Sequence, residues 1–382
     1  MYVALIVIFV LSVFLSVYTY VFYPAILFAL RKKYPKHTLN TEYFPKVSVI
    51  IAAYNEEKVI REKAENLLSL NYPIEKMEFL FGSDGSTDKT VAILNEYKNI
   101  PSFKIFDYKR GGKVNVLNNL MKEASGEIFI FTDANTMLHP DAVKILVQSF
   151  KDNIGCVSGQ LRLMPTGKND TGEQSEGSYW KYENIIKKYE SKIGKLSGAN
   201  GALYAVKREL CSELPSNIIN DDFYISTMVT MSGKDVIMNA DAIAYETPND
   251  SLKSQFDRHI RDGAGHYQLI PKFLPLLSPL KGAASFTYVS HRLIRWLVPF
   301  FIILAIVSSF ILAFNSVAFA VIFALQALCY LFMVLYSFLQ SKNIKIPLVS
   351  MVFYFLCVNL ALLLGLFRLC TKKQKQTWET QR

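Results

Sequence analysis

Cysteine is scarce in this sequence, and its spacing excludes two classes of protein. The chain has 382 residues and five cysteines, and none of the five stands in a spacing typical of zinc ligands or of a disulfide framework. They are Cys156, Cys211, Cys329, Cys357 and Cys370. Small secreted domains held by disulfides and zinc-binding modules are therefore not predicted. Scattered thiols of this kind are typical of a reducing compartment.

Charged residues are missing from the start of the chain. Residues 1–30 contain no Asp, Glu, Lys or Arg, and about 20 apolar residues suffice for a helix to cross a bilayer. We expect a retained transmembrane anchor here. A cleavable signal peptide is the alternative, but it would begin with basic residues and end at a small-residue cleavage site, and neither is found in this stretch.

A second long region also lacks charge. Residues 296–340 are uncharged, the turn-like Asn315-Ser316 divides them into two expected spans, and residues 346–367 are apolar enough for a third. The expected order is an anchor at 1–30, a folded domain at 31–268, an interfacial segment at 269–291, a transmembrane region of two to three helices at 292–370 and a basic tail at 371–382. The pattern predicts a multi-pass protein of the cell membrane.

Acidic residues are fewer than basic ones, 32 against 42, which leaves a formal net charge of +10. Lys and Arg beside the apolar stretches, next to anionic lipid, account for this excess. It forms no basic stripe of the kind that binds nucleic acid. Membrane lipids are therefore expected partners, and nucleic acid is not.

The basic flanks predict an orientation in the membrane. Arg31-Lys32-Lys33 follow the first apolar stretch, and Arg292 and Arg295 adjoin the second. Because cytoplasmic flanks are enriched in Lys and Arg, we expect the intervening domain to be cytoplasmic. Three carboxy-terminal spans would put the basic tail outside. Either one carboxy-terminal segment lies in the membrane interface, or the tail departs from the rule.

Between the membrane segments, apolar runs alternate with helical patterns. Strand-like runs include residues 47–53, 103–106 and 127–131, and helical patterns cover 56–70 and 88–97. This alternation is typical of an α/β fold with a doubly wound sheet. In such a sheet the ligand crevice lies at the carboxyl ends of the strands.

Acidic residues stand where that crevice is expected. Asp84 and Asp133 each follow an apolar run, and the pair Asp221-Asp222 comes later. A sugar leaving a nucleoside diphosphate needs a divalent cation against the diphosphate, oxygen ligands to hold the cation, and a carboxylate to take the proton of the attacking hydroxyl. The order of acids therefore suggests chemistry on a nucleotide sugar at a membrane.

Six motifs in order support a more specific reading. They are VSVIIAAYNEE, GSDGSTD, RGGKVNVLN, FTDAN, SGANGALYAV and NDDFYISTMVTMSG. Together, over residues 46–268, they resemble the family-2 inverting glycosyltransferases of the membrane-anchored, polysaccharide-biosynthesis type. The resemblance implies a GT-A type doubly wound mixed sheet with a Rossmann-like nucleotide-binding half.

The resemblance also implies a donor site and a metal site. The donor-binding residues it suggests are Ala53, Tyr54, Glu56, Asp84, Lys113 and Asp133. Alternatives remain: Glu56 could favour a helix N-terminus, Asp84 could be a turn residue and Lys113 could belong to a surface turn. Asp133 and Asn135 stand where the family has a DxD motif that holds Mg²⁺ or Mn²⁺. Because Asn135 lacks a charge, the free enzyme should bind the metal more weakly.

Asp222 is the general base that the resemblance implies, and an N-cap of the following helix is the alternative. Residues implied or suggested to contact acceptor or diphosphate are Trp180, Gly198, Asn200, Asp221, Arg258 and Arg261. Trp180 could equally be a core residue, and Arg261 could lie on a solvated basic face. Processive members of the family carry a QxxRW motif, and here only its Arg survives, as Arg261, with Asp262 in place of the Trp.

The expected function is that of a membrane glycosyltransferase. It would transfer a sugar, with inversion, from a nucleoside-diphosphate sugar to a lipid-linked or polysaccharide acceptor on the cytoplasmic face. Two alternatives stay open. One is a processive polysaccharide synthase that extrudes its product. The other, more distant, is a catalytically inactive scaffold subunit, for which Asn135 is the sole sign.

Overall fold

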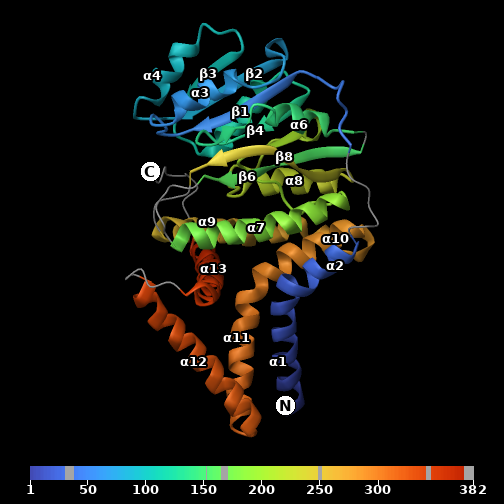
Figure 1. Ribbon diagram of the computed structural model, residues 1–382, viewed down its shortest axis with the longest axis vertical. Coiled ribbons are helices and arrows are strands. Elements are labelled where there is room, and N and C mark those ends of the chain that lie inside the picture. Colours follow the sequence, from blue (N-terminus) through green and yellow to red (C-terminus); the bar gives the residue numbers. More distant parts are fainter. Residues whose placement is uncertain (31–37, 152, 165–170, 248–251, 341–345, 374–382) are drawn as a thin grey trace. The chain divides into compact units, whose positions relative to one another are not determined.

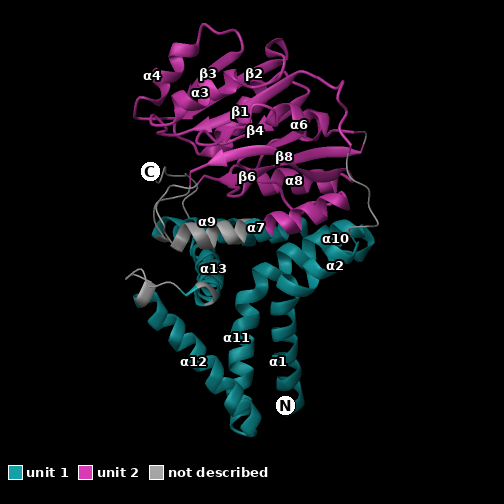
Figure 2. Cartoon of the chain, in the orientation of Figure 1, with its two compact units in different colours: residues 1–30, 167–182, 250–374 teal, residues 31–166, 183–249, 375–382 magenta. Residues whose placement is uncertain are grey.

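A computed structural model describes the chain except for residues 31–37, 152, 165–170, 248–251, 341–345 and 374–382, and it leaves the side chains of 171–180, 252, 339–340 and 347–348 undescribed. The chain forms two compact units (Figure 2). One contains residues 1–30, 167–182 and 250–374, and the other contains residues 31–166, 183–249 and 375–382. Each unit is described by itself below.

The larger unit is built on a mixed sheet, eight-stranded within the described residues (Figure 1). Its strands are β1 Val47–Ala53, β2 Met77–Asp84, β3 Phe103–Tyr108, β4 Ile128–Phe131, β5 Met137–Leu138, β6 Ile154–Leu163, β7 Tyr204–Lys207 and β8 Asp235–Glu246. The spatial order is β3-β2-β1-β4-β7-β6-β8-β5. The first four strands in this order are parallel, β7 is antiparallel to both its neighbours, and β6 and β8 are parallel.

The apolar composition of the central strands follows from their position. Every residue of β1 and of β2 is buried, and a parallel strand covered on both faces needs a nearly continuous apolar run. At the end of β1 the sheet gives way to polar loops. The carboxyl ends of β1, β2 and β4 therefore lead into the segments that carry Tyr54, Asp84 and Asp133.

The helices of this unit are short. They are α3 Ile60–Leu68, α4 Thr90–Leu94, α5 Lys113–Glu123, α6 Ala142–Gln148 and α8 Asp221–Met231, together with 3-10 turns at Ile74–Lys76, Asn95–Tyr97 and Arg208–Leu210. Helix α5 packs on β1 and β2, and α6 and α8 pack on β6 and β8. Helix α7, Thr171–Lys192, continues from one unit into the other.

The first helix of this unit, α3, begins later than the sequence predicts, at Ile60 rather than at Glu56. The segment before it contacts a neighbouring loop. Asn55 adopts a left-handed conformation with φ of 53°, and the backbone N–H groups of Glu56 and Glu57 donate to the Thr90 and Asp88 side chains. Those N–H groups are therefore used to join two loops. The predicted helix 88–97 likewise shortens to α4 and a 3-10 turn.

The other unit is helical. Its elements are α1 Tyr2–Val17, a π-turn at Tyr18–Phe22, α2 Tyr23–Leu30, α9 Leu252–Leu269, 3-10 turns at Ile270–Leu277 and Pro279–Lys281, α10 Ala283–Thr287, a π-turn at Tyr288–Leu293, α11 Ile294–Ala313, α12 Val317–Gln340 and α13 Pro347–Cys370. By length and composition, four segments of the described chain could cross a membrane: Tyr2–Leu30, Ala283–Ala313, Val317–Phe338 and Val349–Cys370.

Helix α9 packs against α13 within the helical unit. The two helices make a close backbone contact. A Cβ added at Gly365 of α13 would lie 2.6 Å from the Ile260 carbonyl oxygen, and one added at Gly263 would lie 3.1 Å from the Leu362 Cα. His259 also bonds to Tyr354 at 3.1 Å. Small residues on facing helices let α9 and α13 approach closely.

Candidate active site

Two loops at the carboxyl ends of β1 and β2 are joined by hydrogen bonds. The Asn55 N–H donates to Ser86 Oγ at 3.1 Å, and the Thr87 N–H donates to Asn55 Oδ1 at 2.8 Å. The Glu56 N–H donates to Thr90 Oγ1 at 2.8 Å. These bonds fix the segment that carries Ala53, Tyr54 and Glu56, three of the predicted donor-binding residues.

Asp84, at the end of β2, is fully buried and holds the loop before α5. It accepts hydrogen bonds from the Gly111 N–H at 2.7 Å and the Gly112 N–H at 2.9 Å, and an ion pair of 2.5 Å joins it to Arg110. Gly112 has φ of 91°, a conformation that favours glycine. In this structure Asp84 organises the loop before α5, and the donor-binding role that the resemblance implies for it stays a prediction.

Arg110 links this loop to the first one. Its guanidinium carbon lies 3.3 Å from the centre of the Tyr54 ring, a distance at which a cation on an aromatic face is attracted by the ring. One Arg thus contacts both Asp84 and Tyr54, two of the predicted donor-binding residues. The RGGK motif singled out Lys113 but did not reveal this role of Arg110.

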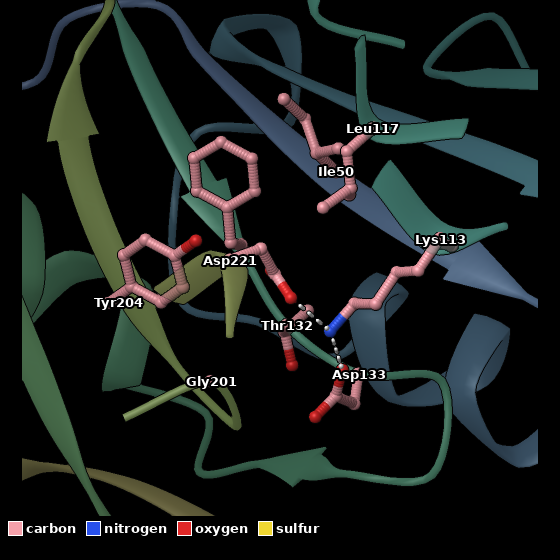
Figure 3. A pocket seen from close by; sticks show the side chains of 10 residues that line it. Ile50, Lys113, Leu117, Thr132, Asp133, Gly201, Tyr204 and Asp221 are labelled. Atoms are coloured by element: carbon pink, nitrogen blue, oxygen red, sulfur yellow. Dashed lines mark hydrogen bonds and ion pairs between the residues drawn. The ribbon is translucent and has the colours of Figure 1, made fainter. Parts of the chain in front are cut away.

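Lys113 is the first residue of α5 and lies between the carboxylates of Asp133 and Asp221 (Figure 3). Its Nζ lies 3.0 Å from Asp133 Oδ1 and 3.5 Å from Asp221 Oδ1. Burial disfavours the charged ammonium, but the Asp133 and Asp221 carboxylates outweigh it and raise the pKa of Lys113 above its ordinary value. Lys113 therefore stays protonated at neutral pH, with two carboxylates as its partners.

The turn that carries Asp133 is held by hydrogen bonds from a buried lysine, Lys63. Lys63 of α3 is fully buried, and its Nζ donates to Thr132 Oγ1 at 3.0 Å and to the Thr136 carbonyl at 2.5 Å. Thr132 in turn donates to the Ala202 carbonyl at 2.8 Å. Burial lowers the pKa of Lys63 to about 7, although the charge of Asp133 opposes this. The sequence signal was a lysine on the apolar face of α3, between Ile60 and Leu67.

Asn135, two residues beyond Asp133, is bound through its side chain. Its Nδ2 donates to Glu246 Oε1 at 3.0 Å. Glu246 is the last residue of β8 and is half-buried. It was not among the predicted site residues, although it is an acid at the end of a strand, which is the pattern that drew attention to the others.

The Asp221-Asp222 pair begins α8, and the N-cap is Asn220. Asp222 is thus not the cap that the alternative reading required. The Asp222 carboxylate lies close to the loop that carries Gly201, and a Cβ added at Gly201 would be 3.1 Å from Asp222 Oδ2. Burial and the Asp221 carboxylate raise the pKa of Asp222 to about 6, against the opposing charges of Lys113 and Lys187. Lys187 of α7 is a further residue that the sequence did not indicate.

The loop before β7 is tied to α8 and to the sheet. The Ala199 N–H donates to Ser226 Oγ at 3.0 Å, and the Asn200 N–H donates to Ser158 Oγ at 3.1 Å. Asn200 Oδ1 accepts from the Ala202 N–H at 3.1 Å, and Gly198 has φ of 95°. In this structure Gly198 and Asn200, which were predicted to contact the acceptor, shape the loop that lies against Asp222.

A small pocket opens among these residues (Figure 3). It encloses about 210 Å³, part of it open to solvent, and Lys113, Asp133 and Asp221 form its polar wall. Its other lining residues are Ile50, Ala52, Leu117, Phe131, Thr132, Gly201 and Tyr204. The Tyr204 ring stacks on Phe131 with ring centres 4.9 Å apart. Burial, together with Asp221 and Asp222, raises the pKa of Tyr204 well above its ordinary value.

The remaining predicted site residues lie on other elements. Trp180 is in α7, at a position where side chains are not described. Arg258 and Arg261 are in α9, in the helical unit. Arg261 lies 3.4 Å from Asp262. Burial favours the neutral form of Asp262, but the surrounding Arg and His charges outweigh it and lower the pKa of Asp262. The roles predicted for these three residues stay predictions.

The residues present fit a divalent cation that is shared with a ligand. Asp133 offers a carboxylate with 38% of its side chain exposed, and Asn135 offers an amide oxygen. Within the described part of the chain, no three His, Cys, Asp or Glu side chains gather to hold a metal ion. Mg²⁺ usually binds through one or two carboxylates plus substrate phosphates, and this donor set suits that mode.

Comparisons with known proteins agree with this geometry. Residues 48–214 match the family described as Glycosyl transferase family 2. A poly-beta-1,6-N-acetyl-D-glucosamine synthase from Staphylococcus epidermidis is 25% identical over 242 residues, 62% of this chain and 58% of that protein. The probable glycosyltransferase YdaM from Bacillus subtilis is 26% identical over 65% of this chain and 61% of that protein. The chain thus spans about three fifths of the length of these relatives.

A solved structure shares the fold. The mannosyltransferase PcManGT from Pyrobaculum calidifontis, in complex with GDP-Man and Mn²⁺, matches 97% of this chain and 99% of its own with a TM-score of 0.73 at 21% identity. The predicted fold class, a GT-A type mixed sheet with apolar helices towards both ends of the chain, is confirmed. The resemblance to family-2 glycosyltransferases is thus supported over residues 48–214, and a poly-beta-1,6-N-acetyl-D-glucosamine synthase is among the proteins to which the chain is similar.

Proposed function

We propose that this glycosyltransferase transfers a sugar, with inversion, from a nucleoside-diphosphate sugar to a lipid-linked or polysaccharide acceptor on the cytoplasmic face of the membrane. The observation that carries the proposal is the ion-paired group at the sheet edge. Lys113 lies 3.0 Å from Asp133 and 3.5 Å from Asp221, and Asp222 follows directly. This group combines a cation for phosphates with carboxylates for a metal and for a proton.

Donor binding uses the first two loops and Lys113. Ala53, Tyr54 and Glu56 border the nucleoside, and Arg110 covers the Tyr54 ring. Asp84 contributes by holding the Gly111 and Gly112 amides, which present Lys113 at the start of α5. The N-terminus of a helix favours anions, so Lys113 is well placed to exchange its carboxylate partners for the donor's phosphate oxygens.

Asp133 and Asn135 would hold Mg²⁺ or Mn²⁺, which supplies positive charge against the diphosphate leaving group. Asp222 takes the proton of the acceptor hydroxyl. The hydroxyl oxygen then bonds to the anomeric carbon while the bond to the diphosphate breaks on the opposite face, which inverts the configuration. One base suffices for this displacement, in contrast to the two carboxyl groups that flank the bond in a glycoside hydrolase.

A donor screen tests the proposal directly. Detergent-purified protein is incubated with Mn²⁺ and a panel that includes UDP- and GDP-sugars, and nucleoside diphosphate release is measured with and without membrane lipid extract. We expect release with one donor class, increased by the lipid acceptor. Thermal unfolding checks that the purified protein is folded. If folded protein released no nucleoside diphosphate with any donor, the result would contradict an active transferase.

Activity should fall as the pH is lowered through about 6, because Asp222 must be ionised to accept a proton and its pKa is raised to about 6. Below that value kcat/KM should drop about tenfold per pH unit, and above it kcat/KM should level off. A pH profile from 4.5 to 8 measures this. In Asp221→Asn the acidic limb should move to lower pH, since the like charge that raises the pKa is gone. An unmoved limb would assign the titration to another group.

The product should carry a single added sugar. Processive relatives retain the polymer with the aromatic residue of QxxRW, and this chain has Asp262 there, which offers no apolar face for stacking on a sugar ring. Mass spectrometry of the product, at low enzyme and excess acceptor, measures its length. A ladder of long chains that is unchanged when the enzyme is diluted would favour the processive synthase instead.

A further inference from the structure

Glu246 is brought to Asn135 by the pairing of two distant strands. Short strand β5 runs antiparallel to β8, with Met137 opposite Tyr245 and Leu138 opposite Ala244. This register carries the residue after Tyr245 towards the residues that precede Met137. The Met164 N–H also donates to the Glu246 carbonyl at 2.9 Å, which fixes the backbone at the end of β8.

The contact between the two side chains has a direction. A carboxylate can only accept hydrogen bonds, so the amide group that faces Glu246 is the NH₂ of Asn135, at 3.0 Å. The Asn135 carbonyl oxygen, Oδ1, must then point away from Glu246. Without such a partner an Asn side chain can turn by 180° and present its NH₂, which cannot bind a cation.

We propose that Glu246 is a positioning residue that holds the Asn135 amide with its Oδ1 turned towards the cation shared by Asp133 and the donor diphosphate. The inference rests on the proposed function, because it assigns Asn135 to the metal site. Partners of this kind orient metal ligands in many proteins, and their loss typically weakens metal binding about 10- to 100-fold. It also explains how a neutral Asn can serve where relatives use a second carboxylate.

Binding of Mn²⁺ in the presence of UDP or GDP, measured by calorimetry, tests this without any need for turnover. Glu246→Ala should weaken Mn²⁺ binding at least about tenfold. Glu246→Gln, which loses the charge but can still accept from Asn135 through its Oε1, should stay within about threefold of the unchanged protein. Glu65→Ala, an exposed Glu on α3, is the matched control. Equal losses in Glu246→Ala and Glu246→Gln would overturn the proposal in favour of a charge effect.

A second background separates orientation from direct coordination. In Asn135→Asp both ends of the side chain are oxygens, so orientation no longer matters. Adding Glu246→Ala then removes a like charge rather than an orienting partner, and it should not reproduce the roughly tenfold loss of Mn²⁺ affinity. An equal loss in both backgrounds would show that Glu246 acts independently of Asn135. If the unchanged protein binds Mn²⁺ no better with nucleoside diphosphate than without it, the proposed function fails rather than the role of Glu246.

Discussion

Asp222→Asn is expected to reduce sugar transfer by about 10²- to 10⁴-fold, the range that general base catalysis contributes, while donor binding changes little. Asn has nearly the shape of Asp but cannot accept a proton at neutral pH. Asp222 lies beside Gly201, whereas the ion pairs of Lys113 are with Asp133 and Asp221, so the charge of Asp222 should matter more for proton transfer than for holding the diphosphate. Initial rates with the donor found by the screen give kcat, and calorimetry with Mn²⁺ and the nucleoside diphosphate gives affinity.

Two variants serve as controls for this result. Asp107→Asn removes an exposed carboxylate on β3 and should leave both measurements unchanged. Asp221→Asn removes the neighbouring charge while keeping the base, so it should retain more activity than Asp222→Asn. Transfer within tenfold of the unchanged protein in Asp222→Asn would remove Asp222 from the role of base.

Asp133→Ala is expected to weaken Mn²⁺-dependent binding of nucleoside diphosphate by at least about 100-fold. This exceeds the loss that is typical when a residue that only orients a metal ligand is removed. Asp133 is the only carboxylate in the DAN motif, so no second acid in it can substitute. The variant should still fold, because the Asp133 side chain is 38% exposed and the turn keeps its bonds from Lys63 to Thr132 and Thr136. Thermal unfolding checks this.

Asn135→Asp is the complementary change and should lower the Mn²⁺ concentration needed for binding, since it adds a charged ligand. The contact of residue 135 with Glu246 also affects how strongly Mn²⁺ stabilises this variant. Two carboxylates would stand where the 3.0 Å hydrogen bond is now, and like charges at that distance disfavour each other. Stabilisation by Mn²⁺ in thermal unfolding should therefore be larger than for the unchanged protein. Unchanged metal dependence would show that residue 135 is not a ligand.

The order of elements was predictable because it depends on local pattern. The apolar run 47–53 predicts a central strand, and the uncharged residues 1–30 predict an apolar helix, without knowledge of any contact. Helix starts were less predictable. Helix α3 begins at Ile60, after a segment whose N–H groups bond to the loop that follows the next strand, and the helical periodicity of residues 56–70 contains no sign of those partners.

The partners of the site residues depended on contacts between remote segments. Local sequence is enough to place Asp84 and Asp133 at strand ends, because an apolar strand and the polar residue that follows it are adjacent in the chain. Only the tertiary structure turned Asp84 towards the amides of Gly111 and Gly112. It alone set Glu246 against Asn135, which is 111 positions away. Strand order and register decide such pairs, and they result from packing of the whole sheet rather than from local periodicity.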